Sequence, residues 1–111
     1  MKSEKTLQQR CLKLLNTWEG SGKAVIGVRT NAGKVKNTAG RWIELCPKGW
    51  PDITACIDGR FTGFELKTGK GRQSQDQKRM AVRITLAHGD YVVIRDEKEL
   101  NRYLRERLGE I

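Results

Sequence analysis

Two acidic residues and a lysine are spaced so that they could form a metal site for phosphodiester hydrolysis. Pro51-Asp52 opens one stretch of strand-forming residues, and Glu65-Leu66-Lys67 ends the next, thirteen residues after Asp52. Carboxylate oxygens are the ligands that Mg²⁺ and Mn²⁺ prefer, and these ions also accept phosphate oxygens. A metal held there would lower the pKa of a bound water. Lys67 could orient or deprotonate that water, or stabilise the charge growing on the phosphorane.

The turn between the two stretches decides whether these side chains meet. Residues 52–57 and 61–67 alternate in polarity and are rich in strand formers. Asp58-Gly59 between them is a strong signal for a two-residue type I′ turn, because both residue types tolerate the positive φ that it needs. The sequence therefore predicts a β-hairpin. Its core face would carry Ile53, Ala55, Ile57, Phe64 and Leu66.

With a two-residue loop, the hairpin places Asp52 directly opposite Glu65, their β-carbons about 5 Å apart. Lys67 shares that face because side chains alternate along a strand. A loop shifted by one residue would pair Asp52 with Lys67 instead, and a three-residue loop with a bulge would break the register. Facing carboxylates repel each other, which favours a cation between them. The alternative is a solvated hairpin face whose ion pair contributes little.

Composition points to a nucleic-acid partner. The chain has 111 residues, enough for one domain, and carries 22 Lys and Arg against 13 Asp and Glu, a formal charge of +9. This balance favours a polyanion, with nucleic acid ahead of an anionic membrane surface. We expect two basic loops, residues 31–41 and 69–72, to hold phosphates. The side chains concerned are Lys34, Lys36, Arg41, Lys70 and Arg72.

The same composition bears on location. An apolar run of about 18 residues is absent, and so is the apolar core of a signal peptide, so no membrane span is expected. Three cysteines without close pairs, Cys11, Cys46 and Cys56, argue against a zinc site or a disulfide scaffold. We expect them to be buried or half-buried packing residues in a reducing, cytoplasmic setting.

Periodicity along the chain predicts an α/β domain with the element order α-β-β-β-α-β-α. The expected elements are a helix over 4–18, a strand over 24–30, the two hairpin strands, a helix over 74–88, a strand over 91–95 and a last helix capped by Asp96. Residues 31–41 are expected to form a flexible basic loop or a ribbon, and residues 42–45 could add a short strand.

Two more polar residues lie on the inward stripes of the predicted helices. Glu4, three positions before Leu7, could reach the metal site as a third carboxylate, or it is simply an acid favoured in the first turn by the helix dipole. Gln77 shares a stripe with Met80 and could also point toward the site. Ser74 and Gln77 fit a capping box as well, and the two roles of Gln77 are compatible.

Several of these motifs stand together in an order that is similar to a known family. They are Gly49-Trp50-Pro51-Asp52, the hairpin, Phe64-Glu65-Leu66-Lys67 with its glycine-rich and basic loop, and Ser74-Gln75-Asp76-Gln77. This arrangement resembles the VRR-NUC family of the PD-(D/E)XK nuclease superfamily. The similarity runs from about Glu4 to Leu100, and it includes Arg29-Thr30-Asn31 and the strand from Tyr91 to Arg95.

The resemblance implies a restriction-endonuclease-like core, a mixed central sheet flanked by helices, that cuts DNA with Mg²⁺ or Mn²⁺. It implies metal ligands at Asp52, Glu65 and the Leu66 carbonyl, and catalytic residues at Lys67, Gln77 and Glu4. Small stand-alone members resemble phage and bacterial proteins that act as homodimers on branched DNA, four-way (Holliday) junctions included. By that likeness, we expect a homodimer in the cytoplasm of a bacterial or phage-infected cell.

Two other hypotheses compete with a nuclease. A non-catalytic DNA-binding module on the same scaffold would share the charge and the fold, but it would not need the intact set of two acids and a lysine. A basic structural protein that binds RNA would have no use for Asp52 or Glu65, so alanine at either position would leave its function unchanged.

Overall fold

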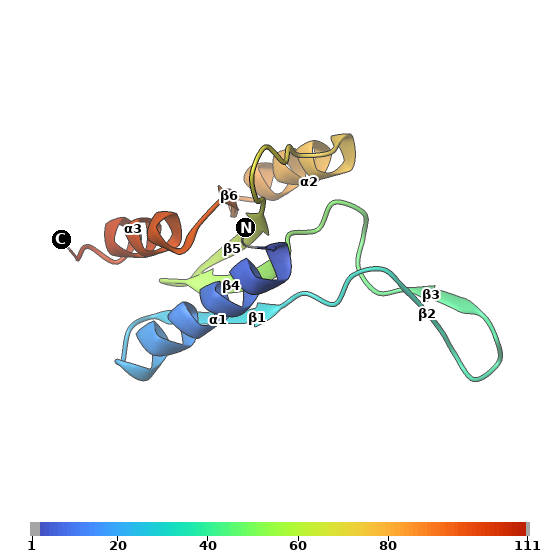
Figure 1. The fold of residues 1–111 in the computed structure, drawn as a ribbon, viewed down its shortest axis with the longest axis horizontal. Helices are drawn as coiled ribbons and strands as arrows, with labels where there is room; N and C mark the ends of the chain where they lie inside the picture. The colour runs from blue at the N-terminus through green and yellow to red at the C-terminus, as the bar shows by residue number, and fades with distance from the viewer. Residues whose placement is uncertain (1–2, 111) are drawn as a thin grey trace.

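In the computed structural model, which describes residues 3–110, a mixed four-stranded sheet is flanked by three helices (Figure 1). None of these helices combines the length and the apolar character needed to cross a membrane. In chain order the elements are α1 (Glu4–Gly20), β1 (Val25–Arg29), β2 (Lys34–Lys36), β3 (Trp42–Glu44), β4 (Ile53–Ile57), β5 (Arg60–Leu66), α2 (Gln75–Leu86), β6 (Asp90–Ile94) and α3 (Glu97–Arg107).

The central sheet has the strand order β1-β4-β5-β6. β1 pairs antiparallel with β4, β4 pairs antiparallel with β5, and β6 runs parallel to β5. The parallel pairing requires a crossover, and α2 supplies it between β5 and β6. The predicted α/β class with a mixed sheet is confirmed.

The expected element order lacked two strands. β2 and β3 pair antiparallel in a separate two-stranded sheet, which we call the ribbon, and it extends away from the central sheet (Figure 1). Of the two alternatives for residues 31–41, the ribbon is therefore correct. The Asn37 side chain orders its tip, because Oδ1 accepts hydrogen bonds from the amides of Ala39 (3.0 Å) and Arg41 (2.9 Å).

The β4–β5 hairpin has the predicted register. Ile57 pairs with Arg60, so Asp58 and Gly59 alone form the loop. Both loop residues have positive φ, 52° and 79°, as a type I′ turn requires. Continuing this register beyond the paired residues places Asp52 opposite Glu65, as predicted.

One face of the central sheet forms the core beneath α1 and α3. The predicted core residues of the hairpin are all buried, and they pack with apolar side chains of the two helices. The core contains Leu7, Cys11, Leu15, Val25, Ile53, Ala55, Ile57, Phe64, Leu66, Ile94, Leu100 and Leu104. Cys56 alternates onto the other face and is exposed, which contradicts the expectation that all three cysteines are buried or half-buried.

The first two helices end at different residues than predicted. α1 continues two residues further, to Gly20, and α2 stops at Leu86. His88 (φ 68°) takes the left-handed conformation that often follows a helix, although Gly89 stands beside it. Gly89 has a different constraint, since a β-carbon there would lie 3.0 Å from both Ile84 and Phe61.

Candidate active site

The segment from Gly49 to Asp52 crosses the sheet face opposite the core at very close range. A β-carbon on Gly63 would lie 2.2 Å from Cγ of Pro51, so only glycine allows the proline to rest on β5. Gly49 has a φ of +85°, and a β-carbon there would lie 2.2 Å from the Asp76 carbonyl oxygen at the start of α2. These two glycines let the chain bring Asp52 to the end of the hairpin.

Asp52 is held by backbone and side-chain contacts. Its Oδ2 accepts a hydrogen bond of 2.8 Å from the Leu66 amide, which brings the carboxylate beside the strand that carries Glu65. Its carbonyl oxygen accepts from the Thr30 amide at 2.9 Å and faces Nε2 of Gln8 at 3.5 Å. The carboxylate therefore has a defined orientation on the second face of the sheet.

Glu65 is the buried centre of the site, with 2% of its surface exposed. Gln77 Nε2 donates to Oε2 at 2.9 Å, and the Tyr91 hydroxyl donates to Oε1 at 3.3 Å. Lys67 Nζ lies 3.6 Å from Oε2, and only 13% of the lysine side chain is exposed. Both carboxylate oxygens thus face donors from other elements of the fold.

The pKa of Glu65 is raised from 4.5 to about 8, first by burial and then by the hydrogen bond and negative charge of Asp52, whereas Lys67 and Tyr91 act to lower it. The pKa of Tyr91 is also raised, first by burial and then by the charge of Glu65. In the protein without a metal, Glu65 therefore retains a proton near neutral pH. A cation placed between the two carboxylates would favour its release.

Gln77 has both of the roles that the sequence left open. Its Oε1 accepts from the Ser74 amide at 2.8 Å while Oγ of Ser74 accepts from the Gln77 amide, which completes the capping box at the start of α2. The amide nitrogen of the same side chain points to Glu65. The cap therefore fixes the rotamer that reaches the site.

Glu4 is the first residue of α1, where its side chain is exposed. Within residues 3–110, no group of three or more His, Cys, Asp or Glu side chains comes close enough to hold a metal, so the structure does not bring Glu4 together with Asp52 and Glu65. Glu4 lies one helical turn before Gln8, and Gln8 makes the contact with Asp52.

Two residues near the site were not predicted. Tyr91 reaches Glu65 because β6 lies parallel to β5, with Tyr91 beside Gly63. Its signal was a hydroxyl-bearing side chain directly before the aliphatic run Val92-Val93-Ile94. Gln8 follows the buried Leu7 in α1, and its signal was a polar side chain next to the inward stripe of the helix.

The predicted phosphate contacts form two separate groups. Lys70 and Arg72 are exposed on the loop after β5, within five residues of Lys67. The other three basic residues are exposed on the ribbon, which extends away from the central sheet (Figure 1). One group therefore lies on the loop that follows Lys67 and the other on the ribbon; the ribbon group is Lys34, Lys36 and Arg41.

Comparisons of the chain with protein-family models, curated proteins and solved structures find no match. What supports a function is therefore the motif order and the geometry of the site. The geometry has two facing carboxylates, a lysine and two hydrogen-bond donors on one sheet face, and this arrangement suits a hydrated divalent cation and a phosphate.

Proposed function

We propose that this protein is a metal-dependent DNA endonuclease of the VRR-NUC type that hydrolyses phosphodiester bonds, with branched DNA as its substrate and little sequence specificity. A restriction-endonuclease-like core, built on the β4–β5 hairpin and the α2 crossover, is part of the same proposal. The observation that carries it is the buried Glu65 carboxylate, which shares a face with Asp52 and lies 3.6 Å from Lys67 Nζ.

Burial of this acid argues against a merely solvated hairpin face. A surface ion pair between long side chains contributes little and needs no supporting donors. Glu65 is instead withdrawn from water and surrounded by Gln77, Tyr91 and Lys67. Withdrawing a carboxylate from water costs free energy, so an acid kept there beside a second acid is typical of a functional site.

The donor set fits Mg²⁺ or Mn²⁺. Mg²⁺ is commonly bound through one or two carboxylates and retains several waters or phosphate oxygens, so it does not need a third protein carboxylate. Asp52 and Glu65 would hold it, with the carbonyl of Leu66 as a further ligand by the family resemblance. When bound, the cation would polarise a phosphoryl oxygen and lower the pKa of a coordinated water.

The side chains of the protein prepare the site for that chemistry. Gln77 and Tyr91 orient the Glu65 oxygens, and the Leu66 amide orients Asp52. Lys67 places a positive charge beside the carboxylates, where it can stabilise negative charge on a phosphate or hold the attacking water. Because little of its side chain is exposed, the position of that ammonium is restricted.

Homodimer formation belongs to the same proposal, because cutting two symmetric strands of a junction needs two sites related by a twofold axis. The sheet face beyond α2 offers an apolar surface for a second copy. Ile26 and Val28 on β1 are 54% and 56% exposed there, and they border a groove that continues to Phe61. Analytical ultracentrifugation should give a dimer for the wild type and a monomer for Ile26→Lys.

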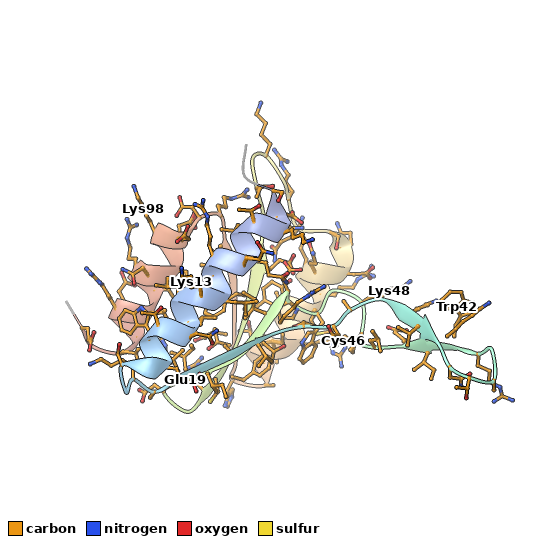
Figure 2. All side chains as sticks on the ribbon, turned by 60° about the horizontal axis from the view of Figure 1, so that its bottom comes forward. Lys13, Glu19, Trp42, Cys46, Lys48 and Lys98 are labelled. Carbon is orange, nitrogen blue, oxygen red and sulfur yellow. The ribbon has the colours of Figure 1, made fainter. Side chains whose placement is uncertain are left out.

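The central experiment incubates the purified protein with labelled four-way junction, flap and linear duplex DNA. Each substrate is tested with Mg²⁺, Mn²⁺ or EDTA. Lys67→Ala is compared with Lys13→Ala, a control that removes an exposed lysine of α1 away from the site (Figure 2). We expect metal-dependent cutting of the branched substrates that Lys67→Ala abolishes and Lys13→Ala preserves.

The outcomes separate the competing functions. Tight DNA binding without cutting under any metal would overturn the nuclease proposal in favour of a DNA-binding module. Cleavage by Lys67→Ala at the wild-type rate would show that Lys67 takes no part in the reaction. Binding that prefers RNA and ignores Asp52→Ala would point to the RNA-binding alternative.

A further inference from the structure

The three tryptophans of the chain are placed very differently. Trp18 is half-buried at the edge of the core, and its Nε1 donates to Asn101 at 3.1 Å. Trp50 is half-buried beside Phe61, and its Nε1 donates to Thr54 at 2.9 Å. Trp42 is 65% exposed on the ribbon (Figure 2). Packing explains the first two positions but not the third.

The ribbon has two chemically distinct faces. Side chains alternate, and Lys36 pairs with Trp42 while Lys34 pairs with Glu44, so these four residues share one face. Nζ of Lys36 lies 5.3 Å from the centroid of the Trp42 ring, within the range of a cation–π contact. The aromatic ring thus stands in a basic surrounding. The opposite face carries the exposed apolar residues Val35, Ile43 and Leu45.

The tip that adjoins Trp42 is ordered. The Asn37 side chain accepts from the Ala39 and Arg41 amides, and the Asn37 amide donates to the Arg41 carbonyl at 2.9 Å. Arg41, exposed, immediately precedes Trp42. Because side chains alternate, the cations on the face of the Trp42 ring are Lys34 and Lys36. An ordered turn that presents an aromatic ring beside these cations loses little conformational entropy when a ligand stacks on it.

We propose that Trp42 stacks on an unpaired base of the DNA while Lys34 and Lys36, which share its face of the ribbon, contact the flanking phosphates. An exposed ring with neighbouring cations is the arrangement by which proteins bind single-stranded nucleic acid without reading its sequence. The proposal rests on the proposed function for the identity of the polyanion as DNA. It adds that the substrate has unpaired bases, as at the branch point of a junction or flap.

A fully paired duplex fits the ribbon less well. In a duplex each base face is covered by its neighbours, so the ring would find only edges. Reading those edges requires hydrogen-bonding side chains aimed into a groove. The one amide side chain at the tip, Asn37, has its oxygen engaged within the turn.

The test measures binding in EDTA, so that no cleavage interferes. Fluorescein-labelled oligo(dT) and a paired duplex of equal length are titrated with wild type, Trp42→Ala, Trp42→Phe and Ile43→Ala. The last variant removes an exposed apolar residue from the opposite ribbon face. Stacking on one base predicts a loss of affinity of about 5- to 150-fold for oligo(dT) in Trp42→Ala. Trp42→Phe should recover part of that loss, and Ile43→Ala should bind like the wild type.

Intrinsic fluorescence provides a second readout that does not depend on the alanine variant. Oligo(dT) should quench the wild type and leave Trp42→Phe, which retains the packed Trp18 and Trp50, almost unchanged. Equal losses on oligo(dT) and duplex, no loss on either, or quenching that persists in Trp42→Phe would each overturn the stacking role.

These results are independent of the nuclease assay. If the protein cuts DNA but the Trp42 variants bind like the wild type, only the stacking proposal is wrong. If the protein binds oligo(dT) through Trp42 but cuts no DNA, only the nuclease proposal is wrong.

Discussion

The carboxylate pair and the ribbon differ in how far their side chains are exposed to solvent. Glu65 is 2% exposed, and both of its oxygens face donors from other elements. Trp42 is 65% exposed on a two-stranded sheet that leaves the body of the protein (Figure 1). Chemistry at a phosphorus centre requires atoms fixed to a fraction of an ångström, whereas a flexible polyanion requires accessible rings and charges. The two regions match these two demands.

Replacing one of the proposed metal ligands should have the largest effect. We expect Asp52→Asn to lower the cleavage rate more than the roughly 10- to 100-fold typical of losing an outer hydrogen-bond partner, because by the proposed function it removes a direct ligand. The ribbon is untouched, so affinity for oligo(dT) in EDTA should equal that of the wild type. Single-turnover cleavage and anisotropy titration measure the two effects. A parallel fall in both would show that the pair and the ribbon are not independent.

Glu65 should make the stability of the protein depend on pH. Its raised pKa, about 8 against the ordinary 4.5, means that folded Glu65 retains a proton that the unfolded chain releases. The free energy of unfolding should therefore fall as pH rises from about 4.5 to 8, with little further change above. Thermal melts of wild type and Glu65→Gln in EDTA at pH 5, 7 and 9 give the difference directly.

In these melts, the glutamine variant should gain melting temperature relative to the wild type as pH rises. Added Mg²⁺ at pH 9 should raise the melting temperature of the wild type more than that of Glu65→Gln, since a ligand that binds only the folded state stabilises it. Parallel curves for the two proteins would contradict the raised pKa.

Gln77 is expected to have a smaller effect than the ligands, because it orients Glu65 and also caps α2. Gln77→Ala should lower the cleavage rate by about 10- to 100-fold, as for outer-shell partners elsewhere. Ser74→Ala is the matched control, since it weakens the same cap without removing the amide at Glu65. Both variants should lose some melting temperature, and only Gln77→Ala should lose most of its rate. Equal rates would leave Gln77 as a capping residue alone.

The parts of the fold that depend on local rules were predictable. Asp58-Gly59 favours one turn type, that turn fixes the hairpin register, and the register places Asp52 opposite Glu65. The capping box at Ser74 and Gln77 was predictable for the same reason, since three residues of separation define it.

Contacts between distant segments were not predictable in this way. Tyr91 reaches Glu65 only because β6 pairs in parallel with β5, and no local pattern chooses that partner strand. Gln8 reaches Asp52 from α1 across 44 residues of sequence. The ribbon was left as one of two alternatives, because its three-residue strands are too short for a clear alternation of polar and apolar side chains.

Replacing a lysine of the ribbon should have the smallest effect of the changes considered. It tests whether the ribbon contributes to DNA binding without contributing to cleavage. Lys34→Gln removes a charge that lies opposite Glu44 on the ribbon. We expect affinity for a four-way junction in EDTA to fall only a few-fold, and the slope of log affinity against log salt to decrease by about 1, the loss of one phosphate contact. Titrations at several salt concentrations measure both quantities.

Lys98→Gln, which removes an exposed lysine of α3, is the control and should leave the slope unchanged (Figure 2). The cleavage rate at saturating protein should stay at the wild-type value, because a binding charge on the ribbon does not position the reacting atoms. A fall in that rate with the slope unchanged would place Lys34 in the catalytic step and would contradict the separation of the two regions.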